Sequence, residues 1–168
     1  MQKIEVLLSM LILLTFGYSE VKFEESQPRE LQELNEFPEE LVGEYVNVDG
    51  HLTKVSKEKM ETELFTADLT GQRQGVQLKR YKDYFFLNAQ VGEEWELLLI
   101  EQKGEGMLQL KTMGELSEDE VYLLSNLTLT RAEDANSITI NPAIQELERL
   151  IENDFFDEVV RMKKLDLG

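Results

Sequence analysis

Carboxylates are the most abundant side chains in this sequence that could do chemistry. The 168 residues contain 34 Asp and Glu against 17 Lys and Arg, a net charge of −17. Two carboxyl groups held close together can act as a general acid and a general base. The adjacent acidic residues Glu93-Glu94 and Glu118-Asp119-Glu120 fall in predicted turns, which favours solvated charge. A catalytic site made only of carboxylates is therefore a hypothesis that no specific sequence motif supports.

Other catalytic and metal-binding motifs are absent from the sequence. His51 is the single histidine, and a Ser-His-Asp triad would have to use it, yet there is no G-x-S-x-G motif. It follows Asp49-Gly50, so we expect an exposed turn residue. There is no cysteine and no calcium-binding loop, and Gly71 and Gly75 lack the Lys-Ser/Thr of a phosphate-binding loop. We therefore identify no catalytic residue, no metal site and no cofactor.

Aromatic residues are concentrated in the middle of the chain, between positions 81 and 95. In a small closed barrel such side chains could line a cavity for an apolar ligand. The candidate cavity residues are Tyr45, Tyr84, Phe86 and Trp95. The alternative is that they fill the core, and we favour it because small barrels are usually solid inside.

The elements that must position these residues are mostly β-strands. Between Gly43 and Met113, short alternating segments are separated by turns, and Asp49-Gly50 is a strong hairpin signal. Residues 95–100 are apolar on both faces, which is typical of a central strand. The pattern predicts an antiparallel meander that closes into a small barrel or packs as a sandwich.

Two helical signals follow this region. Ser117 and Glu120 have the spacing of a capping box, which predicts a short helical turn. Asn141-Pro142 then predicts the start of one C-terminal amphipathic helix near residues 142–152. Residues 155–165 are predicted to form a last strand.

The N-terminus has the pattern of a signal peptide. Residues 6–16 form an apolar run too short to span a bilayer, and small residues precede Glu20. We therefore expect a signal peptide over 1–19, an acidic tether over 20–37 with a candidate short helix at 30–35, and a single β-rich domain over 38–168. Export to the periplasm or the exterior would follow.

The charge limits the classes of partner. Nucleic acids and anionic membrane surfaces attract clustered Lys and Arg, so the excess of acidic residues argues against both. A high net charge also favours a soluble monomer. A small apolar ligand and a cationic protein are the partners that remain.

Three segments carry a resemblance to known proteins. Residues 41–45, Leu-Val-Gly-Glu-Tyr, resemble the opening of lipocalin-like domains, and 84–88 with the strands after it are similar to small secreted or lipid-anchored bacterial proteins of unassigned function. The apolar run at 6–16 also resembles a bacterial lipoprotein leader, with Thr15-Phe16-Gly17 in the place of the residues before the lipidated cysteine, but position 18 is Tyr. The resemblance implies a small β-barrel of the bacterial envelope. Because there is no cysteine, we expect no lipid anchor.

Three functional hypotheses follow, in order of preference. The first is a non-enzymatic binding or structural module of the envelope. The second is an acidic interaction protein, such as an inhibitor, for a cationic partner, whose binding would weaken with salt. The third is a hydrolase with a carboxylate-only site, which requires two carboxyls with strongly shifted pKa values in one cleft.

Overall fold

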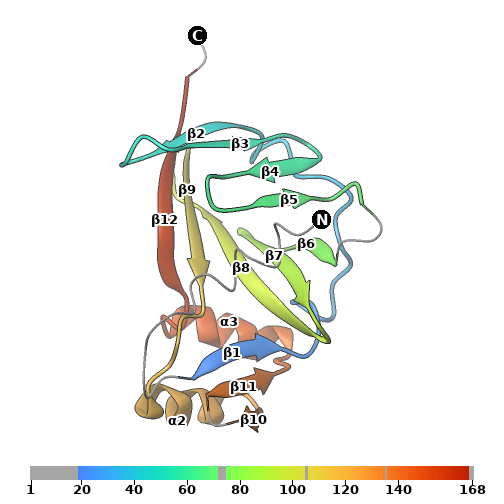
Figure 1. Ribbon diagram of the computed structural model, residues 1–168, viewed down its shortest axis with the longest axis vertical. Coiled ribbons are helices and arrows are strands. Elements are labelled where there is room, and N and C mark those ends of the chain that lie inside the picture. The colour runs from blue at the N-terminus through green and yellow to red at the C-terminus, as the bar shows by residue number, and fades with distance from the viewer. Residues whose placement is uncertain (1–18, 72–74, 105, 135, 167–168) are drawn as a thin grey trace.

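The chain is described here by a computed structural model, which covers residues 19–71, 75–104, 106–134 and 136–166. The predicted signal peptide lies almost entirely outside these residues. The fold is mostly β, as predicted: twelve strands of the described chain form one mixed sheet, and two helices pack beside it (Figure 1).

The strands and helices have the following bounds. The strands are β1 (Glu20–Phe23), β2 (Gly43–Asn47), β3 (Leu52–Val55), β4 (Lys59–Glu61), β5 (Thr66–Asp68), β6 (Val76–Tyr81), β7 (Tyr84–Val91), β8 (Glu94–Gln102), β9 (Met107–Thr112), β10 (Thr130–Asp134), β11 (Ser137–Ile140) and β12 (Asp157–Lys164). The helices are α2 (Glu118–Leu127) and α3 (Ile144–Glu152).

The sheet consists of a long curved part and a short branch. The curved part runs β6-β7-β8-β9-β12-β2-β3-β4-β5, and every neighbouring pair in it is antiparallel. The branch runs β10-β11-β1 and joins the curved part at β8. Within the branch, β1 and β11 are parallel. In Figure 1 the branch and both helices lie below the curved part.

The sheet that the described residues form does not close into a barrel, so that form of the prediction is wrong. All twelve strands belong to a single sheet, and among the described strands β5 pairs only with β4 and β6 only with β7, so the two ends of the curved part do not join each other. β4 and β5 have three residues each, so they offer few backbone groups for closing the sheet. The prediction of a purely antiparallel sheet is also wrong, because β1 pairs with β11 in parallel.

β8 is the central strand, as its apolar residues on both faces predicted. One edge pairs with β7 along residues 94–101. The other edge pairs with β1 at Trp95 and with β9 from Leu98 onward. The sheet therefore forks at Glu96 and Leu97, between the end of one pairing and the start of the next.

β8 also separates two hydrophobic cores. The helix-side core lies between β8 and the branch with its helices and comprises Val21, Phe23, Phe86, Leu97, Leu99, Leu116, Leu124, Ile138, Ile140, Leu147, Leu150, Phe155 and Phe156. The sheet-enclosed core comprises Phe37, Leu41, Tyr45, Val55, Met60, Ala67, Leu78, Phe85, Leu87, Ile100, Leu108, Leu110 and Met162. Leu99 and Ile100 fall in different cores because successive side chains point to opposite faces of a strand.

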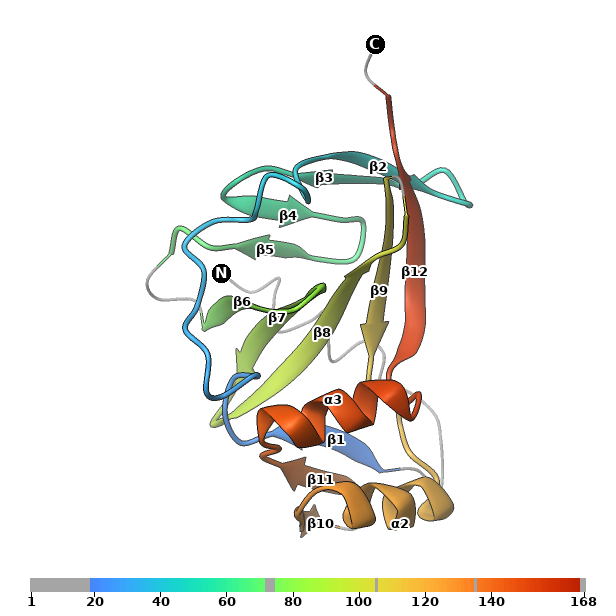
Figure 2. The same cartoon turned by 180° about the vertical axis from the view of Figure 1, so that it is seen from behind.

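The segment predicted as an acidic tether is instead built into the fold. Its first four residues are β1, and Phe37 is fully buried. Figure 2 shows the chain after β1 running up the side of the molecule to β2. The buried Lys79 ammonium donates to the carbonyl oxygens of Ser26 and Pro28, at 3.0 and 3.1 Å. No helix forms at 30–35, because this stretch follows the edge of the sheet and Leu34 bridges to Leu78.

Both predicted helix starts are found, with one difference in each. The Ser117–Glu120 capping box is present, but α2 continues for ten residues, so the domain has a second helix besides the predicted one. α3 begins two residues later than predicted, with Ala143 as its N-cap residue. Asn141 does not cap it, because Oδ1 of Asn141, the atom that would accept a helix N–H, accepts from Nε2 of Gln27 at 3.2 Å instead. The last strand is confirmed as β12.

Candidate functional site

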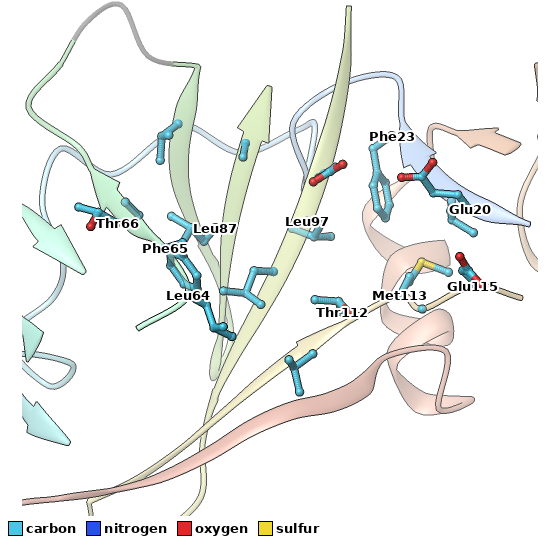
Figure 3. A pocket seen from close by; sticks show the side chains of 18 residues that line it. Glu20, Phe23, Leu64, Phe65, Thr66, Leu87, Leu97, Thr112, Met113 and Glu115 are labelled. Atoms are coloured by element: carbon cyan, nitrogen blue, oxygen red, sulfur yellow. The ribbon is translucent and has the colours of Figure 1, made fainter. Parts of the chain in front are cut away.

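A pocket lies beside the fork of the sheet at β8, between the margins of the two cores (Figure 3). Its lining comes from β1, β5, β6, β7, β8, β9 and β12, and from the segments that precede β5 and follow β9. Its volume is about 170 Å³. An engineered apolar cavity of about 150 Å³ holds benzene, so this pocket has room for an apolar group of similar size.

The pocket is elongated and mostly apolar. In Figure 3, Leu64, Phe65 and Leu87 lie at one side, whereas Phe23 and Met113 lie at the other. Leu97 and Thr112 lie between them in the same view. An elongated apolar recess suits a slender chain better than a compact polar molecule.

Glu96 is the polar residue that distinguishes this pocket. It lies on β8 and lines the pocket, and its Oε2 atom is buried without a hydrogen-bond partner in the described chain. The pKa of Glu96 is raised to about 7, mainly by burial and then by the negative charge of Glu20, whereas Lys22 opposes the rise. Burial favours the neutral form because a low-dielectric environment stabilises charge poorly.

Two more carboxyl side chains line the same pocket. Glu20 is the first residue of β1, and Glu115 follows β9; in Figure 3 both lie on the side of Phe23 and Met113. The nearby Lys22 ammonium lies 3.8 Å from the carboxylate of Glu20 and 3.5 Å from that of Glu94. Because this cation is shared between two other carboxylates, it neutralises Glu96 only in part.

A small residue provides space next to Glu96. Ala89 on β7 lies directly opposite Glu96 on β8 and also lines the pocket. Cross-strand neighbours have Cβ atoms about 5 Å apart, so a larger side chain at this position would project beside the carboxyl group. The methyl group of Ala89 leaves that space open to a ligand.

The four predicted cavity residues lie elsewhere. Tyr45 is buried in the sheet-enclosed core, where its hydroxyl donates to the carbonyl oxygen of Leu41 at 2.9 Å. Phe86 is fully buried in the helix-side core, and Tyr84 and Trp95 pack against that core. None of the four lines the pocket. Their placement agrees with the alternative interpretation, in which the aromatic side chains fill the core.

Sequence reasoning missed Glu96, although a signal was present. Alternation along β8 places Glu96 on the same face as Leu98 and Ile100, so the pattern puts a carboxyl among inward-facing residues. A charged residue at an inward position is uncommon unless it is paired or functional. The other lining residues come from distant segments and have no shared sequence pattern.

His51 is the exposed turn residue that the sequence predicted. It follows the Asp49-Gly50 turn between the paired strands β2 and β3, and Gly50 has a φ of 84°. Its Nδ1 atom lies 2.6 Å from Oε2 of Glu63, and both side chains are exposed. Across the described part of the chain, no group of three or more His, Asp or Glu side chains is arranged to hold a metal ion.

Comparison with known proteins does not assign this chain to a family. No protein-family model, curated protein or solved structure matches it. The likeness to lipocalin-like domains therefore stays a prediction from the sequence. Within the residues that the structure covers, no helix has both the length and the apolar character needed to cross a membrane.

Proposed function

We propose that this chain is a non-enzymatic binding module that takes the apolar part of a small ligand into the pocket at the β8 fork. The observation that carries this proposal is an apolar recess of about 170 Å³ with the buried, unpartnered Oε2 atom of Glu96 in its wall. Binding sites typically combine such an apolar lining with a few polar groups that fix the orientation of the ligand.

The location of the protein is a separate part of the proposal. We infer from the apolar run and the small residues in 1–19 that the chain is exported to the bacterial envelope, and from its net charge of −17 that it acts there as a monomer. Detection of a mature chain that begins at Glu20 would support this inference. An intact N-terminus on the protein isolated from its source would contradict it.

The binding proposal is tested with a neutral apolar probe, hexan-1-ol, titrated into the full chain and followed by amide chemical shifts. We expect shifts clustered on β5, β7 and β8 around the pocket. Replacing Ala89 by Phe should abolish them, because the ring would occupy the space beside Glu96.

The matched control is Ala132→Phe, which places the same ring on the exposed strand β10 outside the pocket. This variant should bind hexan-1-ol like the unmodified chain. Absence of binding by the unmodified chain, or equal binding by both variants, would refute the proposed pocket.

The carboxylate-only hydrolase is a second candidate, and Glu96 is the observation that favours it. A pKa of about 7 suits a general acid or base at neutral pH, and Glu20 and Glu115 line the same pocket. Turnover of ester or glycoside substrates that is lost in Glu96→Gln would support this candidate over simple binding.

A further inference from the structure

We propose that the natural ligand is a slender apolar molecule with a positively charged amino group at one end, and that this ammonium pairs with the carboxylate of Glu96. This inference rests on the proposed function, because it specifies which ligand the same pocket prefers. It uses three observations: the two dissimilar ends of the pocket, the unpartnered Oε2 atom of Glu96, and the absence of any basic residue among the described residues of the lining.

The two ends of the pocket match the two parts of such a ligand. Leu64, Phe65 and Leu87 form an apolar end, and Glu20 and Glu115 lie toward the opposite end (Figure 3). A hydrocarbon chain can leave water at the first end. A cation at the second end then lies among acidic residues, so that charge orients the ligand along the pocket.

Glu96 favours an ammonium over other polar groups. Oε2 of Glu96 lacks a donor in the described chain, and a buried acceptor without a donor is costly. An ammonium supplies three N–H donors and a compensating charge, whereas a hydroxyl supplies one donor and no charge. A carboxylate ligand would instead add negative charge beside acidic residues, so fatty acids should bind worst.

Within the described chain, no basic side chain lines the pocket to fill this role. Lys22, whose charge acts on Glu96, is held between Glu20 and Glu94. Ala89, opposite Glu96, adds only a methyl group to the wall. A ligand amine can therefore approach the carboxyl without displacing an ion pair between Glu96 and another described residue.

The test compares three probes of equal chain length, hexylamine, hexan-1-ol and hexanoate, titrated into the full chain by calorimetry and amide shifts. At about pH 8.5, above the pKa of Glu96, hexylamine should bind at least about tenfold more tightly than hexan-1-ol, which equals about 1.4 kcal/mol. Hexanoate should bind more weakly than the alcohol.

The preference for the amine should also depend on pH. At about pH 5.5 Glu96 is mostly protonated while an alkylamine, with a pKa near that of Lys, stays charged. The charged groups around Glu96 are Glu20 and Lys22 on β1 and Glu115 after β9. Because protonation removes the charge of Glu96, the advantage of hexylamine over hexan-1-ol should shrink several-fold at the lower pH.

A charge-matched pair of variants completes the test. Glu96→Gln should lose the preference for hexylamine but still bind hexan-1-ol. Glu93→Gln removes the same charge from the exposed β7–β8 turn and should keep the preference. Equal affinity for amine and alcohol, or a preference that survives Glu96→Gln, would overturn this inference while the pocket itself stands. Failure of all three probes to bind would overturn both the inference and the proposed function.

Discussion

Replacing Glu96 by Gln should stabilise the folded protein above neutral pH. The carboxyl lies in the wall of an apolar pocket, where Oε2 has no hydrogen-bond donor in the described chain. Ionising it there costs free energy that an ionised glutamate in the unfolded chain does not incur. Gln has almost the same shape but no charge, so the variant avoids this cost.

The size and pH range of the effect follow from the pKa. A rise from 4.5 to about 7 corresponds to about 3.4 kcal/mol at full effect. Because the side chain is only partly buried, screening by water reduces this to about 1–2 kcal/mol. The folded state binds the proton more tightly than the unfolded state, so the free energy of unfolding falls as pH rises from 4.5 to about 7. The variant lacks this decrease.

Urea denaturation of the unmodified chain and of Glu96→Gln between about pH 5.5 and 8.5 measures the difference. The gain in stability of the variant should grow with pH and level off above about pH 7. Glu93→Gln corrects for the general benefit of reducing a net charge of −17, and should change stability by less than about 0.5 kcal/mol. A destabilised Glu96→Gln variant, or a difference independent of pH, would refute the reasoning.

Two further predictions concern contacts of β7, one with Gln27 in the segment after β1 and one with Gly75 before β6. Asn88→Ala should lower the free energy of unfolding, measured with denaturant, by about 2–3 kcal/mol. The side chain of Asn88 accepts the backbone N–H of Gln27 at 2.6 Å and donates to the carbonyl oxygen of Gln27 at 2.8 Å, and both hydrogen bonds would be lost. An unchanged unfolding midpoint would contradict this role. Gly75→Ala should destabilise more than Gly92→Ala in thermal unfolding. Both glycines have positive φ, so both substitutions strain the backbone. A Cβ atom at position 75 would also lie 2.6 Å from the Cβ atom of Gln90, whereas a Cβ atom at position 92 would meet open space. Equal losses of stability in the two variants would show that only backbone strain matters.

Much of the local structure could be predicted from the sequence. The alternation along β8, the Asp49-Gly50 hairpin and the capping box at Ser117 depend on residues close together in the chain. Their physical causes, the two-residue period of a strand, positive φ in tight turns and the unsatisfied N–H groups of a helix start, act locally. These features therefore appear in the structure where the pattern indicated them.

The candidate site was predictable only in part. The period of β8 determines that Glu96 shares a face with Ile100, but not that this face borders a pocket. The aromatic residues illustrate the opposite case. Their types are compatible with a ligand cavity or with a core, and burial in the two cores decided the question for Tyr45 and Phe86.

By itself, the sequence determined a mostly-β chain, its main turns, its helix starts and the excess of acidic charge. Tertiary structure decided that β1 joins β11 and β8, that β5 and β6 do not pair with each other in the described chain, and that a pocket forms at the resulting fork. Strand alternation specifies which face of a strand is buried, but it carries no information on which strand from a distant part of the sequence will pair with that strand. That choice depends on the packing of both cores together, and it also determines the burial that raises the pKa of Glu96.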